Sequence, residues 1–338
     1  MPRVDAMPFT FLMCSERSGS NFLTRLVDAH PELCGPPPVH LIRTLCDGGL
    51  GYADLCDGRV WRALIEDVAA LLATQVGAWR TEWSRERLLV EVEERSLGAL
   101  VRHVYQAEAR AHGKRRLFVK ENHVWRYLPF ILSAFPGATV VYMVRDPRDM
   151  ALSWKRCREL RGDVLRASRV WSRDQAAGLE VLGQLRLCGR IAFVRYEDLV
   201  DRTAEQARRL CEQLGVRYDP EMLLYYTRDD TRAVAAATAS WENVARAPMR
   251  GNHGKFREHL STDEVRWVEH VCGEEMEIFG YPLDHPSLEE PGAVRERLES
   301  VERHDKPGWA QVPESEKRVR AARLEVITRM RTRPSRAA

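Results

Sequence analysis

The sequence lacks several features that would point to other classes of protein. It has no C-x-x-C pair and no cysteine at metal-ligand spacing from a histidine pair, so we expect no metal site. No apolar run approaches the roughly 20 residues that span a bilayer, and the N-terminus has neither the basic flank nor the apolar run of a signal peptide. We therefore expect a soluble, cytoplasmic protein with no membrane span.

The Walker A pattern G-x-x-x-x-G-K-[ST] is also missing. Eight cysteines are present, and without a framework of paired spacings we expect mostly buried free thiols in a reducing compartment. They are Cys14, Cys34, Cys46, Cys56, Cys157, Cys188, Cys211 and Cys272.

Positively and negatively charged residues are nearly equal in number. The 338 residues carry a formal net charge of +3, and 44% of them are hydrophobic. So small an excess does not predict nucleic-acid binding, whereas the hydrophobic fraction allows a sizeable core. Arginine greatly outnumbers lysine. This preference suits bidentate recognition of phosphate or sulfate, although it is equally compatible with the base composition of the gene.

The most informative segment that is present covers residues 9–23. An apolar strand over 9–14 leads into a polar turn, and an amphipathic helix over 18–29 follows. A strand–loop–helix of this kind offers backbone N–H groups and the positive end of a helix dipole to an anion. Arg17, Ser18, Ser20 and Asn21 add charge and hydrogen-bonding groups. The alternative interpretation is an ordinary turn with a helix cap.

A second segment, about 120 residues later, also consists of an apolar strand that leads into a helix. Residues 139–144 form an apolar, β-branched run typical of a buried parallel strand. Asp146 and Pro147 then provide a cap and a first helical residue. Arg145 therefore falls at the carboxyl end of a strand, where open α/β sheets bind ligands, and Ser153 lies about two turns into the next helix. The alternative for Arg145 is an ion pair with a nearby carboxylate.

Taken together, these segments resemble the sulfotransferases that use 3′-phosphoadenosine 5′-phosphosulfate (PAPS). Residues 15–23 look like the family's 5′-phosphosulfate loop, and Arg145 with Ser153 looks like its 3′-phosphate clamp. Residues 193–199 look like the strand and turn that present a tyrosine to the adenine, and residues 254–261 like the late basic loop. The four segments occur in the family's order.

The resemblance implies PAPS as co-substrate, its bisphosphate PAP as product, and no metal. The implied donor-binding residues are Arg17, Ser18, Gly19, Ser20, Asn21, Phe22, Arg145, Ser153, Tyr196, Lys255, Phe256 and Arg257. Many cytosolic members have lysine where this sequence has Arg17, whereas many glycan-modifying and bacterial members have arginine. The resemblance thus implies a glycan or small-molecule hydroxyl as acceptor. Because arginine stays protonated, the role of Arg17 would be electrostatic.

Three residues are candidates for the base that takes the acceptor's proton. Family members commonly use a histidine or glutamate near the end of the second core strand or after the first helix. His123 and Glu121 occupy the first place in this sequence, and His40 the second. Residues 120–122 read Lys-Glu-Asn, which departs from the Lys-Thr-His of the cytosolic group. His123 is our leading hypothesis, and a capping role is its structural alternative.

We predict an α/β, three-layer, P-loop-like fold with a central parallel sheet flanked by helices. Further core strands are expected over 117–120 and 191–195, joined by right-handed crossovers. A helical insertion over about 50–115 is expected over the active site, with a purely structural bundle as the alternative. The predicted domain covers residues 1–285. Residues 286–338 then form a charged extension whose helix over 314–330 docks on the body or mediates association, as in a homodimer.

Two other functions compete with sulfuryl transfer. An ATP-dependent small-molecule kinase with a P-loop-like fold would need Lys-Ser/Thr at the end of the first loop and an acidic residue for Mg²⁺ at a strand end. The loop instead contains Gly19, Ser20 and Asn21, and the strand ends at Arg145. A non-catalytic nucleotide-binding protein would predict loss of Arg17 or of the clamp, and both are present.

Overall fold

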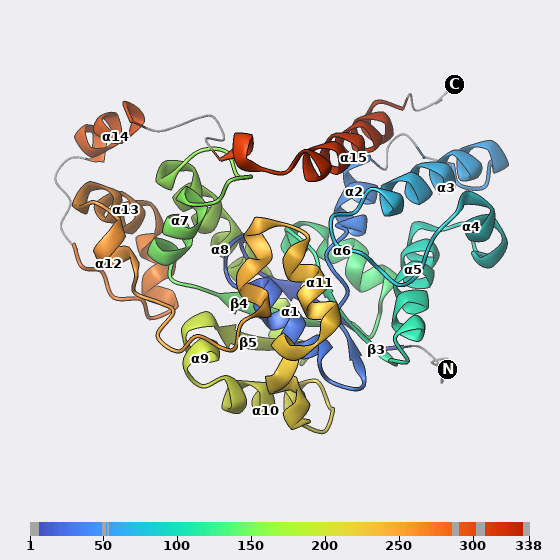
Figure 1. The fold of residues 1–338 in the computed structure, drawn as a ribbon, viewed down its shortest axis with the longest axis horizontal. Helices are drawn as coiled ribbons and strands as arrows, with labels where there is room; N and C mark the ends of the chain where they lie inside the picture. The colour runs from blue at the N-terminus through green and yellow to red at the C-terminus, as the bar shows by residue number, and fades with distance from the viewer. Residues whose placement is uncertain (1–6, 49–51, 53, 286–290, 302–307, 334–338) are drawn as a thin grey trace.

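A five-stranded parallel sheet runs through the centre of the protein (Figure 1). The computed structural model describes residues 7–48, 52, 54–285, 291–301 and 308–333. Within them the strand order is β2-β3-β1-β4-β5, and every neighbouring pair is parallel. The strands are β1 (Phe9–Met13), β2 (Leu33–Cys34), β3 (Arg116–Lys120), β4 (Thr139–Val144) and β5 (Ile191–Arg195).

The predicted parallel sheet is confirmed, and its four predicted strands agree with the structure to within a residue at each end. The sequence analysis missed β2, which pairs with β3 at one edge of the sheet. Two residues are too few to show a periodic pattern, so only the tertiary pairing reveals this strand. The central strand β1 is buried along its whole length, which explains its uninterrupted apolar sequence.

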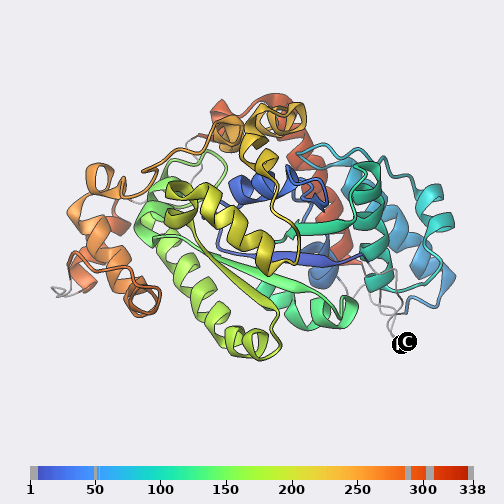
Figure 2. The same cartoon turned by 90° about the horizontal axis from the view of Figure 1, so that it is seen from below.

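Alternate residues of the central strands enter two separate hydrophobic clusters. Phe11 and Tyr142 belong to one cluster, whereas Leu12 and Val141 belong to the other. Helices cover both faces (Figures 1 and 2), which confirms the three-layer architecture. One cluster includes residues of α1 (Ser20–Asp28), α9 (Tyr196–Asp201) and α10 (Thr203–Gln213), and the other residues of α6 (Val124–Ala134), α7 (Pro147–Lys155), α8 (Val164–Leu187) and α13 (Thr262–Ile278).

The predicted insertion is helical and forms one end of the molecule (Figure 1). Its helices are α3 (Gly58–Ala73), α4 (Arg85–Glu91) and α5 (Leu97–Ala111), and α2 (Leu41–Gly48) precedes them. Residues 49–51 and 53, at the start of the predicted insertion, lie outside the described residues. Trp79 donates from Nε1 to the carbonyl oxygen of Pro37 at 2.9 Å. The insertion thus borders the segment that follows the carboxyl end of β2.

The C-terminal helix α15 (Glu314–Thr332) docks on the body across α2 and α3. Arg329 forms an ion pair with the fully buried Asp67 of α3 at 2.7 Å, and Met330 is buried. Of the two roles considered for this helix, docking is observed. Segments 286–290, 302–307 and 334–338 of the predicted extension lie outside the described residues. The remaining helices are α11 (Asp229–Ala236), α12 (Phe256–His259), α14 (Pro291–Glu299), η2 (Pro220–Thr227), η3 (Ala239–Ala245) and η4 (Trp309–Gln311).

Two expectations about composition can be compared with the structure. All eight cysteines are free, as predicted, but only Cys34, Cys211 and Cys272 are buried. The expectation of mostly buried thiols was wrong. Cys56 in the turn before α3 and Cys188 at the cap of α8 are exposed, and the other three are only partly buried: Cys14, Cys46 and Cys157. Among the helices that the structure describes, none is both long and apolar enough to cross a membrane.

Candidate functional site

The loop between β1 and α1 has a backbone that glycine makes possible. Gly19 caps α1 with a φ of 87°, and no side chain caps this helix. A Cβ at Gly19 would clash with the ring of Tyr196, which lies against the loop. Both observations require glycine here. The first turn of α1 therefore keeps its uncapped end beside Tyr196, at the carboxyl edge of the sheet.

Two buried polar atoms at this loop have no partner among the described residues. They are Oγ of Ser18, whose side chain is fully buried, and Nε of Arg145 at the end of β4. A buried donor without a partner costs about 1–3 kcal/mol, so such atoms need an explanation in a folded protein. An anionic ligand in the loop would supply the missing acceptors.

Arg17, Ser153 and Arg145 form a connected set. Arg17 donates from Nε to Oγ of Ser153 at 3.2 Å, and Arg145 donates from Nη1 to the carbonyl oxygen of Arg17 at 3.0 Å. The guanidinium of Arg145 also lies over the ring of Tyr196, with Cζ 4.2 Å from the ring centroid. The structure thus brings together four residues that the sequence spreads over about 180 positions.

The ion pair considered as the alternative for Arg145 does not form in the described part of the chain, and Arg17 forms no ion pair there either. Glu16 accepts from Asn122 Nδ2 at 2.9 Å and is not paired with Arg17. Asp149 accepts from the backbone N–H of Phe256 at 3.0 Å and is not paired with Arg145. Both guanidinium groups keep their charge without a carboxylate partner among these residues, as an anion site requires.

The segment just before the late basic loop contacts Tyr196, the residue whose ring lies against the first loop. Asn252 donates from Nδ2 to the hydroxyl of Tyr196 at 2.7 Å, and Lys255 is exposed. Phe256 is buried beneath the loop with Arg148 over its ring, and Arg257 pairs with Asp284. Of the predicted residues of this loop, Lys255 therefore has the freest charge. Phe22 of the first loop packs against Tyr225, with ring centroids 5.5 Å apart.

Lys120 is a site residue that the sequence analysis did not single out. It ends β3 and donates from Nζ to Oδ1 of Asn21 at 2.9 Å. Burial lowers its pKa, and burial also raises the pKa of the neighbouring Cys14 thiol to about 11. The available signal was a lysine at the carboxyl end of a core strand, the same signal that identified Arg145.

Two of the three base candidates lie together. Nδ1 of His40 and Oε1 of Glu121 are 3.2 Å apart, and the backbone N–H of Ile42 donates to Oε2 of Glu121 at 3.2 Å. The Glu121 side chain is fully buried, whereas that of His40 is 27% exposed. In this geometry Glu121 orients the imidazole, and of the two side chains only that of His40 reaches the surface.

His123 forms a second histidine–carboxylate pair. Its Nδ1 lies 3.5 Å from Oδ1 of Asp174 on α8, and its side chain is 19% exposed. The neighbouring Gln175 donates to Oγ of Ser15 at 2.8 Å, so α8 connects this histidine to the first loop. His123 also stands at the N-cap of α6 without a side-chain capping bond.

Three non-glycine residues in the described chain have a positive φ: Arg17 (63°), His40 (50°) and His123 (57°). All three are predicted site residues. Each such conformation costs on the order of 1–3 kcal/mol and persists where the surroundings impose it, which happens often at functional sites.

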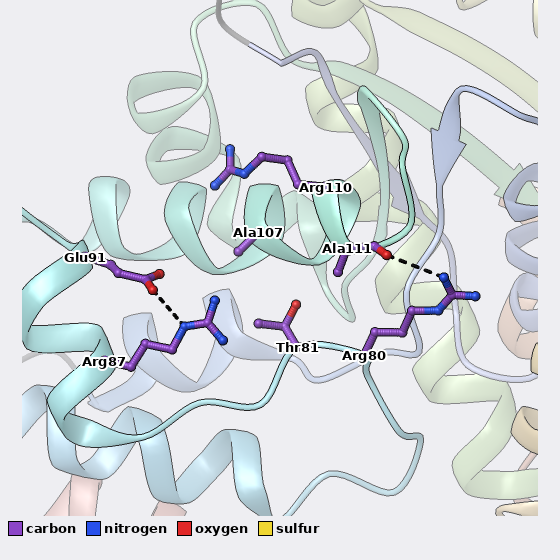
Figure 3. A pocket seen from close by; sticks show the side chains of 7 residues that line it. All are labelled: Arg80, Thr81, Arg87, Glu91, Ala107, Arg110 and Ala111. Carbon is purple, nitrogen blue, oxygen red and sulfur yellow. Dashed lines mark hydrogen bonds and ion pairs between the residues drawn. The ribbon is translucent and has the colours of Figure 1, made fainter.

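A hollow of about 370 Å³ lies elsewhere, between α4 and α5 (Figure 3). It contains none of the predicted site residues, and Arg87 in its wall is already paired with Glu91 at 2.8 Å. Its lining is Arg80, Thr81, Arg87, Glu91, Ala107, Arg110 and Ala111. In the described part of the chain, no group of three or more His, Cys, Asp or Glu side chains is placed to hold a metal ion.

The parallel sheet, the glycine-capped loop after β1 and the arginine at the end of β4 define an α/β protein with a P-loop-like fold. The sequence model described as "Sulfotransferase family" matches residues 8–220, which include the first loop, Arg145, Ser153 and Tyr196. The chain belongs to the sulfotransferase family and is a sulfotransferase enzyme. This assignment decides against the kinase and the non-catalytic alternatives.

Similar proteins come from distant organisms. Nodulation protein NoeE of Sinorhizobium fredii is 23% identical over 316 residues, which cover 87% of this chain and 71% of that protein. A putative protein-tyrosine sulfotransferase of Caenorhabditis briggsae is 23% identical over 222 residues, 62% of this chain and 66% of that protein. The sulfotransferase domain of the Synechococcus PCC 7002 olefin synthase superposes with a TM-score of 0.58 at 21% identity, over 84% of this chain and 98% of that one. The last of these confirms the fold.

Proposed function

We propose that the protein moves a sulfuryl group from PAPS to a hydroxyl of a glycan or small-molecule acceptor, with PAP as the product. The observation that carries the proposal is the pair of buried polar atoms without partners, Oγ of Ser18 and Nε of Arg145. They belong to the two segments that should hold the two ends of a bisphosphate nucleotide. A donor with anionic groups at both ends satisfies both atoms.

The charges around the loop fit such a donor. Arg17, Lys120 and Arg145 have no carboxylate partner among the described residues. We assign the phosphosulfate to Arg17, Lys120 and the uncapped turn of α1, and the 3′-phosphate to Arg145 and Ser153. Tyr196 packs beside the adenine, and Lys255, Phe256 and Arg257 belong to the loop that closes on the phosphate.

The chemistry requires charge stabilisation above all. The acceptor oxygen forms a bond to sulfur while the bond from sulfur to the bridging oxygen breaks, and negative charge builds on the departing phosphate. Fixed positive groups such as Arg17 and Lys120 stabilise that charge without reorganising, because the fold already holds them in place. We propose no metal ion in this step.

The acceptor's proton goes to one of the two histidine–carboxylate pairs. We favour His40, because Glu121 holds its Nδ1 and leaves Nε2 for the acceptor. His123 with Asp174 is the second candidate. In either pair the carboxylate sets the orientation of the ring and stabilises the imidazolium that forms.

We place the acceptor beside His40. The segment just before His40 contacts the helical insertion through Pro37 and Trp79. The arginine at position 17 supports a glycan or small alcohol through the resemblance to glycan-modifying members. A phenol remains the competing acceptor, and the name of the nematode relative refers to protein tyrosine. A phenol is more acidic than an alcohol and depends less on a base.

Calorimetry tests the donor directly. The protein should bind PAP without added metal and should not bind ATP with Mg²⁺ at comparable strength. Transfer of labelled sulfate from PAPS to a panel of sugars, alcohols and phenols then identifies the acceptor class. Preference for ATP with Mg²⁺, or failure to bind PAP, would contradict the proposed donor.

A further inference from the structure

One arginine of the C-terminal helix α15 contacts the backbone next to His40, on the proposed acceptor side of the site. Arg323 donates from Nη1 to the carbonyl oxygen of Leu71 at 2.8 Å and from Nη2 to the carbonyl oxygen of Val39. Val39 is buried and immediately precedes His40. Arg323, which is 284 positions from Val39 in the sequence, thus holds the backbone next to His40.

The surroundings of Glu121 explain why a positive charge matters here. This fully buried carboxylate interacts electrostatically with Arg323, with Tyr105 of α5 and with Cys46 of α2. His40 lies 3.2 Å from it, and Lys120 precedes it on β3. Burial lowers the pKa of Arg323 to about 10, and Glu121 acts in the opposite direction. A buried carboxylate is costly without a nearby cation, and both Lys120 and Arg323 interact favourably with Glu121.

We propose that Arg323 is a positioning residue for the acceptor side of the site, holding the Val39–His40 backbone through its hydrogen bond to Val39. This inference rests on the proposed function in that it takes His40 with Glu121 as the proton-accepting pair. It makes the C-terminal helix part of the active-site architecture, although the helix contributes no group that touches the donor.

The same helix contains a matched control. Arg329 lies nearly two turns further along α15 and pairs with Asp67 of α3 at 2.7 Å. Replacing Arg329 with methionine loosens the docking of α15 but leaves the contact to Val39 in place. Arg323→Met removes the charge and both hydrogen bonds while keeping most of the apolar stem. Arg323→Lys restores the charge without the forked geometry.

The expected results separate a positioning role from a docking role. Arg323→Met should lower kcat about 10–100-fold with PAP affinity unchanged, since small displacements of a catalytic group are costly. Arg323→Lys should restore part of kcat, because it keeps a positive charge in the same place. Arg329→Met should change neither kcat nor the affinity for PAP.

Hydrogen–deuterium exchange provides a readout that needs no catalysis. Amides of residues 39–46 should exchange about tenfold faster in Arg323→Met than in Arg329→Met, because local opening follows the lost contacts. If Arg323→Met fails to fold, Arg323→Lys provides the same comparison, with faster exchange over 39–46 and an intermediate kcat.

Equal effects of Arg323→Met and Arg329→Met on exchange and kcat would overturn the proposal, because Arg323 would then only anchor the helix. If the wild type transfers sulfate and Arg323→Met has the same kcat and exchange, the positioning role is overturned. The proposed function would then remain intact. A wild-type protein that transfers no sulfate, but shows the selective change in exchange, would retain the positioning role and overturn the proposed function.

Discussion

The guanidinium of Arg145 lies over the ring of Tyr196, with Cζ 4.2 Å from the centroid. The same ring leaves no room for a Cβ at Gly19, and its hydroxyl accepts from Asn252. Tyr196 therefore joins the end of β4, the loop after β1 and the late basic loop. Burial raises the pKa of this tyrosine, so it stays neutral, and the single positive charge of Arg145 remains available to an anion.

The first prediction concerns Arg17. Arg17→Ala should lower turnover by about 10²–10³-fold, the usual loss for one charge-stabilising donor. Affinity for PAP should change only a few-fold, because PAP lacks the sulfuryl group that Arg17 faces. Steady-state rates and calorimetry measure the two effects. Arg115→Ala is the control, since Arg115 forms an exposed pair with Glu32. A near-normal rate in Arg17→Ala would remove this residue from the mechanism.

The second prediction concerns the 3′-phosphate. Arg145→Met should weaken PAP binding by about 1.5–3 kcal/mol, the usual worth of a charge-assisted hydrogen bond. Binding of adenosine 5′-phosphosulfate, which lacks the 3′-phosphate, should weaken much less. Ser153→Ala should show the same selectivity with a smaller loss. If both nucleotides lose affinity equally, Arg145 does not read that phosphate.

The third prediction concerns Gly19. Gly19→Ala should weaken PAP binding more than about tenfold, because a Cβ at a φ of 87° forces the Tyr196 ring away from the loop. Gly113→Ala is a matched control, since Gly113 also has a positive φ but open space around its Cβ position. The control should lose about 1 kcal/mol of stability from backbone strain and keep its affinity for PAP. Equal affinities in the two variants would show that the contact with Tyr196 is dispensable.

The fourth prediction identifies the base. A histidine base gives a rate that rises with pH through roughly 6.5, because only the neutral ring accepts a proton. His40→Ala should abolish this rise and lower turnover by about 10²–10⁴-fold, and Glu121→Gln should lower it through the same pair. If His123→Ala has these effects and His40→Ala does not, the role belongs to His123. If all three variants remain active, the acceptor is acidic enough to react without a base, as a phenol is.

The fifth prediction concerns Asp67, which anchors α15. Burial opposes its ionisation, but hydrogen bonds from Arg333, Tyr52 and Arg329 outweigh burial and lower the pKa of Asp67. A lowered pKa adds stability above the unfolded value of about 3.9, and this stability is lost as the pH falls through the folded-state pKa. Asp67→Asn should therefore cost about 1–2 kcal/mol at neutral pH, allowing for the partly exposed arginines.

Urea unfolding at neutral and acidic pH measures the cost of Asp67→Asn. The difference from the wild type should shrink as the pH falls from about 4 through the folded-state pKa, because only below that pKa does Asp67 lose its charge in both states. Glu314→Gln is the control, since Glu314 forms an exposed pair with Lys317. A difference that is independent of pH would show that the pairing of α15 with Asp67 is not electrostatic.

Much of the site could be predicted from the sequence because its parts are local. Arg17 and Gly19 lie in one turn, and Asp146 and Pro147 start one helix, so short patterns reveal them. Lys120 was missed, although it ends a strand as Arg145 does, because its role in the site depends on a partner in a distant segment. Its contact with Asn21 joins residues 99 positions apart, and no pattern in either segment encodes that distance.

The sequence by itself determined the strand–loop–helix that begins with β1 and the run of β4 with its capped helix. Each depends on residues a few positions apart, whose periodicity and conformational preferences act locally. Only the tertiary structure decided that His40 meets Glu121 and His123 meets Asp174, and that Arg323 reaches Val39. These pairings join distant segments, and their energies depend on burial that exists only once the sheet and its helices have packed.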